Sequence, residues 1–159
     1  MEEFIPRIDK AARHIQASPE RLFGACMDPE QFIKWLPPEG MTGVIEEFHP
    51  HEGGTFRIRL TYTVTDADYG KSGEHTDIST GRFIEIVPPE RFVQTVVFQS
   101  DDPQYAGEMR QTWTFESQGD GTLVSVRSEH VPPGIRQEDH LIGMNSTLEN
   151  LEKYVENKD

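Results

Sequence analysis

The feature that most constrains the fold is the strict alternation in "TFRIRLTYTV", residues 55–64. Thr or Arg occupies every other position, and the positions between them are apolar or aromatic: Phe56, Ile58, Leu60, Tyr62 and Val64. Because successive side chains of a strand point to opposite faces, the pattern predicts a strand with one buried and one solvated face. Such strands are typical of antiparallel sheets.

Other segments repeat this signal. The segment "KAARHIQAS" predicts a first strand, and five more candidates are separated by Gly- and Pro-containing turns: "GVIEEFH", "TGRFIEIV", "RFVQTVVF", "EMRQTWTFES" and "TLVSVRSEHV". The polar segment "DADYGKSGEHTDIST", residues 66–80, shows no periodicity and is expected to form a loop at one end of the sheet. The chain therefore predicts a meander of strands.

Helices are predicted at both ends of this meander. "SPERLFGAC" from Ser18 and "DPEQFIKW" from Asp28 each begin with a capping residue followed by Pro and Glu, which predicts two short helices. After "VPPG" an apolar stripe predicts one long helix that runs to about residue 155: Met144, Leu148, Leu151 and Val155. Gly143 weakens this helix, so we expect a close approach of another segment there.

This order predicts an α+β fold, in which a curved antiparallel sheet of about seven strands surrounds the C-terminal helix. Such a sheet does not close completely on one helix, which predicts a cavity between the two. The expected ligand-binding residues are the inward-facing members of the strands and helices: Trp35, Phe56, Ile58, Leu60, Tyr62, Trp113, Met144 and Leu148.

Composition narrows the function classes. The 159 residues, 35% of them hydrophobic, fit a single domain spanning 1–159. A formal charge of −13 with no basic run disfavours nucleic acid and anionic membranes as partners. Cys26 has no partner for a disulfide, and we expect it to be a small buried hydrophobe. No leader or membrane span is evident, so a cytoplasmic protein without a metal or cofactor is expected.

Five segments in order resemble a known family: "ASPERLFGACMDPEQFIKWLPPEGM", "HPHEGGTFRI", "TGRFIEIVPPERFVQT", "GDGTLVSV" and "GMNSTLENLEKYVE". They are similar to the START-like, or SRPBCC, superfamily, and most similar to the branch named after the C-terminal domain of the activator of heat-shock protein 90 ATPase. The resemblance implies a helix-grip fold in which Trp35 ends the second short helix at the cavity mouth. This chain departs from the family pattern after Trp35, at His49 and His51, and at Met144, so no relative's ligand is carried over.

Three functions remain open. The first is the binding of a small apolar or weakly polar molecule, neutral or weakly acidic, by a monomer or a homodimer. The second, implied by the family name, is a co-chaperone or stress-response module that binds a partner. It is disfavoured because the eukaryotic activators carry a preceding domain and this chain begins at the first strand. The third is a cyclase- or hydrolase-like enzyme of the same superfamily.

No linear motif supports catalysis. His49, His51, Arg110, Gln111 and His130 are candidate polar members of the pocket, with Tyr62 and the Trp113 indole as donors. The alternation places His130 on the face of Val124 and Val126, where a lone His is more often structural than catalytic. His14 and His140 show no companion residues. One residue of the Glu46–Glu47 pair is expected either to face inward as a pocket carboxylate or to sit at a bulge. The favoured interpretation is that the pair places charges on an edge strand, which discourage aggregation.

Overall fold

The computed structural model describes residues 7–37, 40–62, 76–100 and 102–156. Its elements follow in chain order: β1 (Ile8–Ile15), α1 (Pro19–Met27), α2 (Pro29–Trp35), β2 (Met41–Phe48), β3 (Thr55–Tyr62), β4 (Thr76–Val87), β5 (Arg91–Phe98), the 3₁₀ helix η1 (Pro103–Tyr105), β6 (Met109–Gln118), β7 (Gly121–Glu129) and α3 (Gln137–Glu156).

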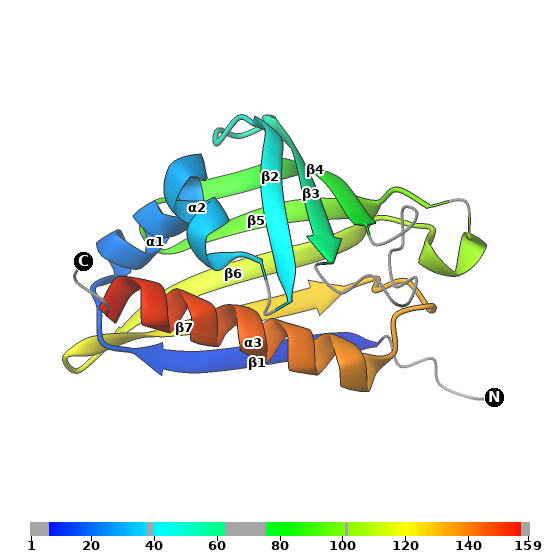
Figure 1. Cartoon of the computed structure of the whole chain (residues 1–159). Coiled ribbons are helices and arrows are strands. Elements are labelled where there is room, and N and C mark those ends of the chain that lie inside the picture. The colour runs from blue at the N-terminus through cyan, green and yellow to red at the C-terminus, as the bar shows by residue number, and fades with distance from the viewer. Residues whose placement is uncertain (1–6, 38–39, 63–75, 101, 157–159) are drawn as a thin grey trace.

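The strands form one antiparallel sheet of seven strands in the order β1-β7-β6-β5-β4-β3-β2. Strands β2 to β7 are a meander, and β1 pairs with β7 at the far side. The sheet curves, and α3 lies along its concave side beside β1 and β7, with α1 and α2 near its C-terminal end (Figure 1). The predicted α+β helix-grip fold is confirmed.

Both short helices begin as the sequence predicts. Ser18 Oγ accepts a hydrogen bond from the backbone N–H of Arg21 at 3.1 Å, and Asp28 Oδ1 accepts one from the N–H of Glu30 at 3.0 Å. Each cap is followed by Pro at the first helical position, where no backbone donor is needed. Asp28 is both the residue after the end of α1 and the cap at the start of α2, so it fixes where α2 begins and hence the position of Trp35.

Three of the four residues of the predicted apolar stripe of α3 are buried, and the fourth, Val155, is partly buried. Met144 is 7% exposed, and Leu148 and Leu151 are fully buried against the sheet. Arg13 of β1 donates two hydrogen bonds to Glu152 Oε1, at 2.9 and 2.7 Å, which ties the sheet to the helix. The stripe therefore anchors the C-terminal half of α3 in the core.

The prediction of a loop over residues 66–80 is partly wrong. Residues 76–80 belong to β4, where Thr76 pairs with Thr61 of β3, and Ser79 with Phe98 of β5. Backbone pairing on both sides holds this segment extended, although its side chains show little apolar periodicity. Residues 63–75, including the end of the predicted strand at Val64, lie outside the described residues.

The charged pair of β2 takes the outer position. A bulge separates Ile45 from Glu47, and Glu46 accepts hydrogen bonds from Arg57 at 2.7 Å and Arg59 at 3.3 Å. These arginines therefore lie on the polar side of β3, as the alternation predicts. Charges on an edge strand discourage pairing with other chains, which fits the favoured interpretation of the pair.

Candidate functional site

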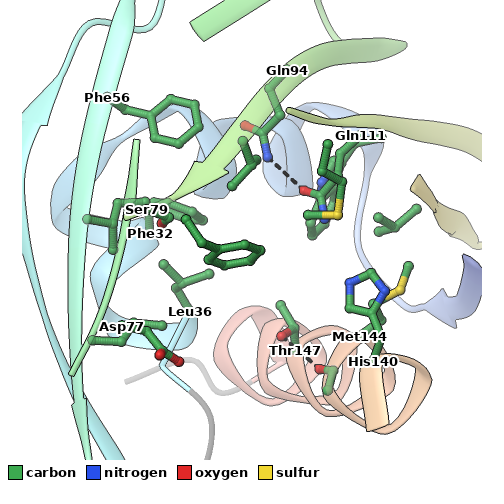
Figure 2. Close-up of a pocket in the computed structure, with 18 of the residues that line it drawn as sticks. Phe32, Leu36, Phe56, Asp77, Ser79, Gln94, Gln111, His140, Met144 and Thr147 are labelled. Carbon is green, nitrogen blue, oxygen red and sulfur yellow. Dashed lines mark hydrogen bonds between the residues drawn. The ribbon is translucent and has the colours of Figure 1, made fainter. Parts of the chain in front are cut away.

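A pocket of about 490 Å³ lies between the concave side of the sheet and the helices (Figure 2). Its walls come from α1, α2, all strands from β2 to β7, and the N-terminal half of α3. Most lining side chains are apolar or aromatic. Its volume and composition match those of pockets that hold small organic molecules.

Seven of the eight residues predicted to bind a ligand line this pocket: Trp35, Phe56, Ile58, Leu60, Tyr62, Trp113 and Met144. Leu148, the eighth, is fully buried and does not line the pocket. It follows Met144 by one helical turn, where α3 already packs into the solid core.

Trp35 ends α2 and is 2% exposed. Its indole N–H donates to the backbone carbonyl of Ala25 at 3.0 Å, and its ring makes edge contacts with Phe32 and Trp113 at centroid distances of 5.1 and 6.1 Å. A large aromatic side chain that closes a helix here has two roles. It packs the core and forms one wall of the pocket.

Trp113 stacks on Phe92, with ring centroids 5.6 Å apart and planes inclined by 12°. Its Nε1–H is buried and has no hydrogen-bond partner among the residues described. An unpaired buried donor costs about 1–3 kcal/mol. The ring nevertheless stays in the aromatic wall, because stacking and burial hold it.

Gly143 contradicts the expectation of a close approach. A Cβ atom added to it would meet nothing within 4 Å, and the residue lines the pocket. The missing side chain therefore widens the pocket at the middle of α3. Gly143 therefore lowers the helix propensity of α3 at a position where the pocket would have room for a side chain.

A row of four polar residues crosses the concave side of the sheet. Asp9 pairs with Ser128, Ser128 with Gln111, and Gln111 with Gln94, on strands β1, β7, β6 and β5. Gln94 Nε2 donates to Gln111 Oε1 at 2.9 Å, and Gln111 Nε2 donates to Ser128 Oγ at 3.2 Å. Gln94 and Gln111 line the pocket, so this polar row gives it one polar side (Figure 2).

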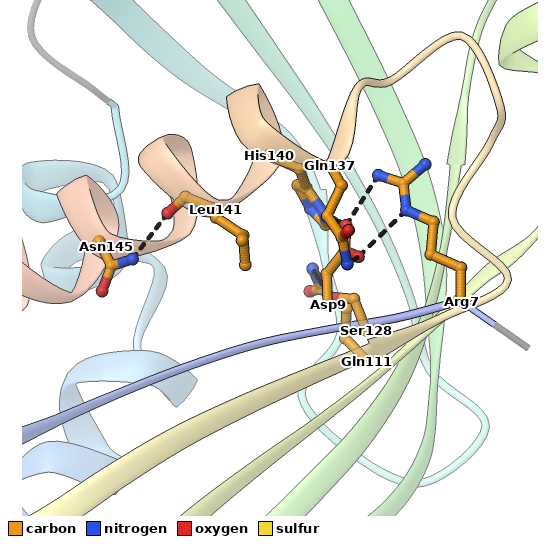
Figure 3. Close-up of polar contacts among 8 residues, drawn as sticks. All are labelled: Arg7, Asp9, Gln111, Ser128, Gln137, His140, Leu141 and Asn145. Carbon is orange, nitrogen blue, oxygen red and sulfur yellow. Dashed lines mark hydrogen bonds and ion pairs between the residues drawn. The ribbon is translucent and has the colours of Figure 1, made fainter.

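Asp9 ends the row as a fully buried carboxylate with four donors (Figure 3). Arg7 donates twice, at 3.1 and 2.8 Å, Gln137 Nε2 donates at 2.9 Å, and His140 Nδ1 lies 2.7 Å from Oδ2. Burial alone raises the pKa of Asp9, but the hydrogen bonds from Arg7, His140 and Gln137 outweigh it and hold the pKa below its usual range. Asp9 is therefore ionised at neutral pH.

Among the described residues, His140 is the histidine that lines the pocket, and the expectation that it has no companion is wrong. Because an ionised carboxylate only accepts hydrogen bonds, Asp9 fixes the proton on Nδ1. The imidazole lines the pocket on the same side as Gln111, and its side chain is 14% exposed (Figure 2). None of the described residues hydrogen-bonds to its Nε2.

Other polar candidates lie elsewhere. His130 follows β7 with a φ of 58° and is exposed, because the strand ends at Glu129 and the chain turns away from the inner face. Arg110 is exposed and does not turn into the pocket. His49 and His51 lie in the exposed turn between β2 and β3. These residues contribute nothing to the pocket wall.

A second polar point lies across the pocket from His140. Asp77 is 7% exposed, and the Tyr62 hydroxyl donates to its Oδ2 at 3.5 Å. Burial, followed by the nearby Asp77 carboxylate, raises the pKa of Tyr62. Figure 2 shows Asp77 on the opposite side of the pocket from His140. The pocket thus has an apolar middle and two different polar ends.

Cys26 is 2% exposed, and burial raises the pKa of its thiol far above the usual range. A thiol of this kind is a poor nucleophile. Cys26 therefore acts as a small apolar wall residue, as the sequence predicts.

Sequence reasoning missed Asp9, His140 and Gln94. The one available signal was a polar residue at an inward position of an otherwise apolar strand, as in "RFVQTVVF". Nothing in the sequence shows that four such positions share one register.

Among the described residues, no helix is both long and apolar enough to cross a membrane.

Comparisons with known proteins agree with this architecture. A solved structure from Chromobacterium violaceum is 29% identical and superposes with a TM-score of 0.83, covering 95% of this chain and 98% of its own. A protein from Rhodobacter sphaeroides is 22% identical, with a TM-score of 0.77 and coverages of 96% and 93%. A solution structure from Staphylococcus epidermidis is 20% identical, with a TM-score of 0.77 and coverages of 99% and 94%.

A comparison with curated proteins finds no match. The likenesses below 25% identity establish the fold only. Residues 16–156, however, match the family described as "Activator of Hsp90 ATPase homolog 1-like protein". The predicted resemblance is confirmed, and this chain belongs to the family of activator of Hsp90 ATPase homolog 1-like proteins.

Proposed function

We propose that this protein binds a small, mostly apolar molecule in the pocket between the sheet and α3. The observation that carries the proposal is the open space beside Gly143, in a pocket of about 490 Å³ lined by aromatic and aliphatic side chains. Protein interiors are normally packed to high density, so an apolar space of this size is a feature that a ligand would fill.

The family supports a ligand-binding or co-chaperone-like module. The pocket favours the first of these alternatives. The co-chaperone alternative needs a docking surface, and the formal charge of −13 is unfavourable for an acidic chaperone. Stimulation of a cognate chaperone's ATP turnover by the purified protein would reverse this preference.

Tryptophan fluorescence offers a direct test. Both tryptophans of the chain, Trp35 and Trp113, line the pocket, so their emission should report its occupancy. Titration with decan-1-ol should shift the emission in a saturable way. Gly143→Leu places a side chain in the pocket and should reduce the affinity at least tenfold.

The matched control is Gly24→Leu. Gly24 is also a helical glycine at which an added Cβ atom would meet nothing within 4 Å, and it does not line the pocket. This variant should bind decan-1-ol like the parent protein. Equal affinity of the parent and Gly143→Leu, or no saturable signal in the parent, would contradict the proposed function.

A further inference from the structure

The polar side of the pocket carries a hydrogen-bonding group, the His140 imidazole, that a purely apolar ligand would not contact through a hydrogen bond. His140 Nδ1 is committed to Asp9 at 2.7 Å, while Nε2 has no partner among the described residues and belongs to a side chain on the pocket wall. Asp9 itself needs no further donor, because Arg7 and Gln137 also donate to it. The arrangement fixes the imidazole so that its second nitrogen is left for a ligand.

The charges around His140 decide what that ligand is. On α3 and just before it, Arg136 and Asp139 line the pocket, and Arg136 forms an exposed ion pair with Glu138 at 3.9 Å. Beneath the imidazole, the charge of Asp9 is offset by Arg7, at 2.8 Å. Strands β6 and β7 present only the uncharged Gln111 and Ser128 there. Because Arg7 already offsets the charge of Asp9, protonation of His140 places a positive charge directly on the pocket wall.

Asp77, the remaining charged residue among the described members of the wall, lies on the opposite side of the pocket (Figure 2). An anionic group is therefore favoured near protonated His140, at the opposite end of the pocket from Asp77. The Gln94–Gln111 pair beside His140 supplies additional hydrogen-bonding groups on the same side. The pocket is thus asymmetric along its length.

We propose that the pocket takes an amphipathic weak acid, whose carboxylate accepts a hydrogen bond from Nε2 of protonated His140 while its apolar chain fills the aromatic middle. This inference rests on the proposed function and adds the class of head group and its orientation. It assigns His140 as the residue that recognises the head group, and Asp9 as the residue that positions His140.

Proton uptake on binding is the signature of this arrangement. Imidazole side chains titrate near neutral pH. A carboxylate placed at Nε2 favours the protonated form, so binding near pH 7 should draw a proton from the buffer. An uncharged ligand of equal length should draw none. Calorimetry in two buffers that differ in ionisation enthalpy, phosphate and Tris, measures the protons taken up.

The experiment compares decanoate with decan-1-ol on the parent protein, His140→Gln and His130→Gln. We expect decanoate to bind the parent with uptake of a fraction of a proton at pH 7 to 7.5, and to lose about tenfold in affinity and all proton uptake in His140→Gln. Decan-1-ol should bind all three proteins within about twofold. His130→Gln is the control, because His130 is an exposed histidine outside the pocket.

The outcomes separate this inference from the proposed function. If decan-1-ol and decanoate bind the parent equally and without proton uptake, the inference is wrong and the proposed function stands. Proton uptake that persists in His140→Gln would assign the proton to a group other than His140, the ligand carboxylate included, and would also overturn the inference. If neither compound binds, both fail together. The measurement on the parent protein decides the question even where His140→Gln does not fold.

Discussion

The substitution Asp9→Asn measures how much the hydrogen bonds around Asp9 contribute to the free energy of unfolding. The carboxylate is fully buried and accepts four hydrogen bonds, two from Arg7, one from Gln137 and one from His140. The single carbonyl oxygen of Asn keeps about two of them, and its NH₂ group then faces the other donors. Each hydrogen bond to a charged group contributes about 1.5–3 kcal/mol, so the loss of two predicts about 3–6 kcal/mol.

The expected value lies at the low end of this range. Arg7 is 29% exposed and His140 is 14% exposed, so water can partly replace the lost acceptor. We therefore expect Asp9→Asn to lower the free energy of unfolding by about 3 kcal/mol at pH 7. In urea this corresponds to a fall in the midpoint of roughly 1–3 M, measured by circular dichroism.

The loss should depend on pH in a defined direction. Because the pKa of folded Asp9 is below its usual range, the carboxylate stabilises the fold fully above the unfolded pKa, near 4. This stabilisation is lost as the pH falls through the lower, folded pKa. The difference between the parent and Asp9→Asn should therefore shrink as the pH falls below about 4.

The control is Asp120→Asn, an exposed carboxylate that accepts one hydrogen bond of 3.3 Å from Gln16. It should change the free energy of unfolding by less than about 0.5 kcal/mol at any pH. A cost below about 1 kcal/mol for Asp9→Asn, or a difference that stays constant from pH 7 to 3, would refute the idea that Asp9 is an ionised, fully hydrogen-bonded carboxylate.

Two further substitutions test the wall of the pocket. Gly143→Ala should raise the free energy of unfolding by about 0.5–1 kcal/mol, because the methyl group meets nothing within 4 Å, and Gly24→Ala in α1 should do the same; destabilisation in thermal melts would show that Gly143 is needed for close packing. Trp35→Ala should weaken the binding of decan-1-ol by roughly 1–3 kcal/mol, because it removes a large aromatic side chain, 2% exposed, from the pocket wall. This loss should exceed that caused by His140→Gln. Fluorescence of the remaining Trp113 would report that affinity, and an unchanged value would exclude Trp35 from the contact.

The sequence by itself determined the elements and the family. Alternation in β3, the capped starts of α1 and α2, and the stripe of α3 are local signals, since each depends on residues within a few positions of one another. The same signals predicted the apolar wall, because an inward position of a strand stays inward whatever its neighbour is. Strand residues such as Phe56 and Trp113, predicted to face inward on this basis, both line the pocket.

Only the tertiary structure decided the polar side of the pocket. Asp9 and His140 are 131 residues apart, and they meet because β1 closes the sheet beside β7 while α3 returns across it. The row through Ser128 and Gln111 depends on the register of three strand pairs, and a shift of one residue would turn these side chains to the other face. Register and helix docking are set by the packing of the whole chain, so no local pattern contains them.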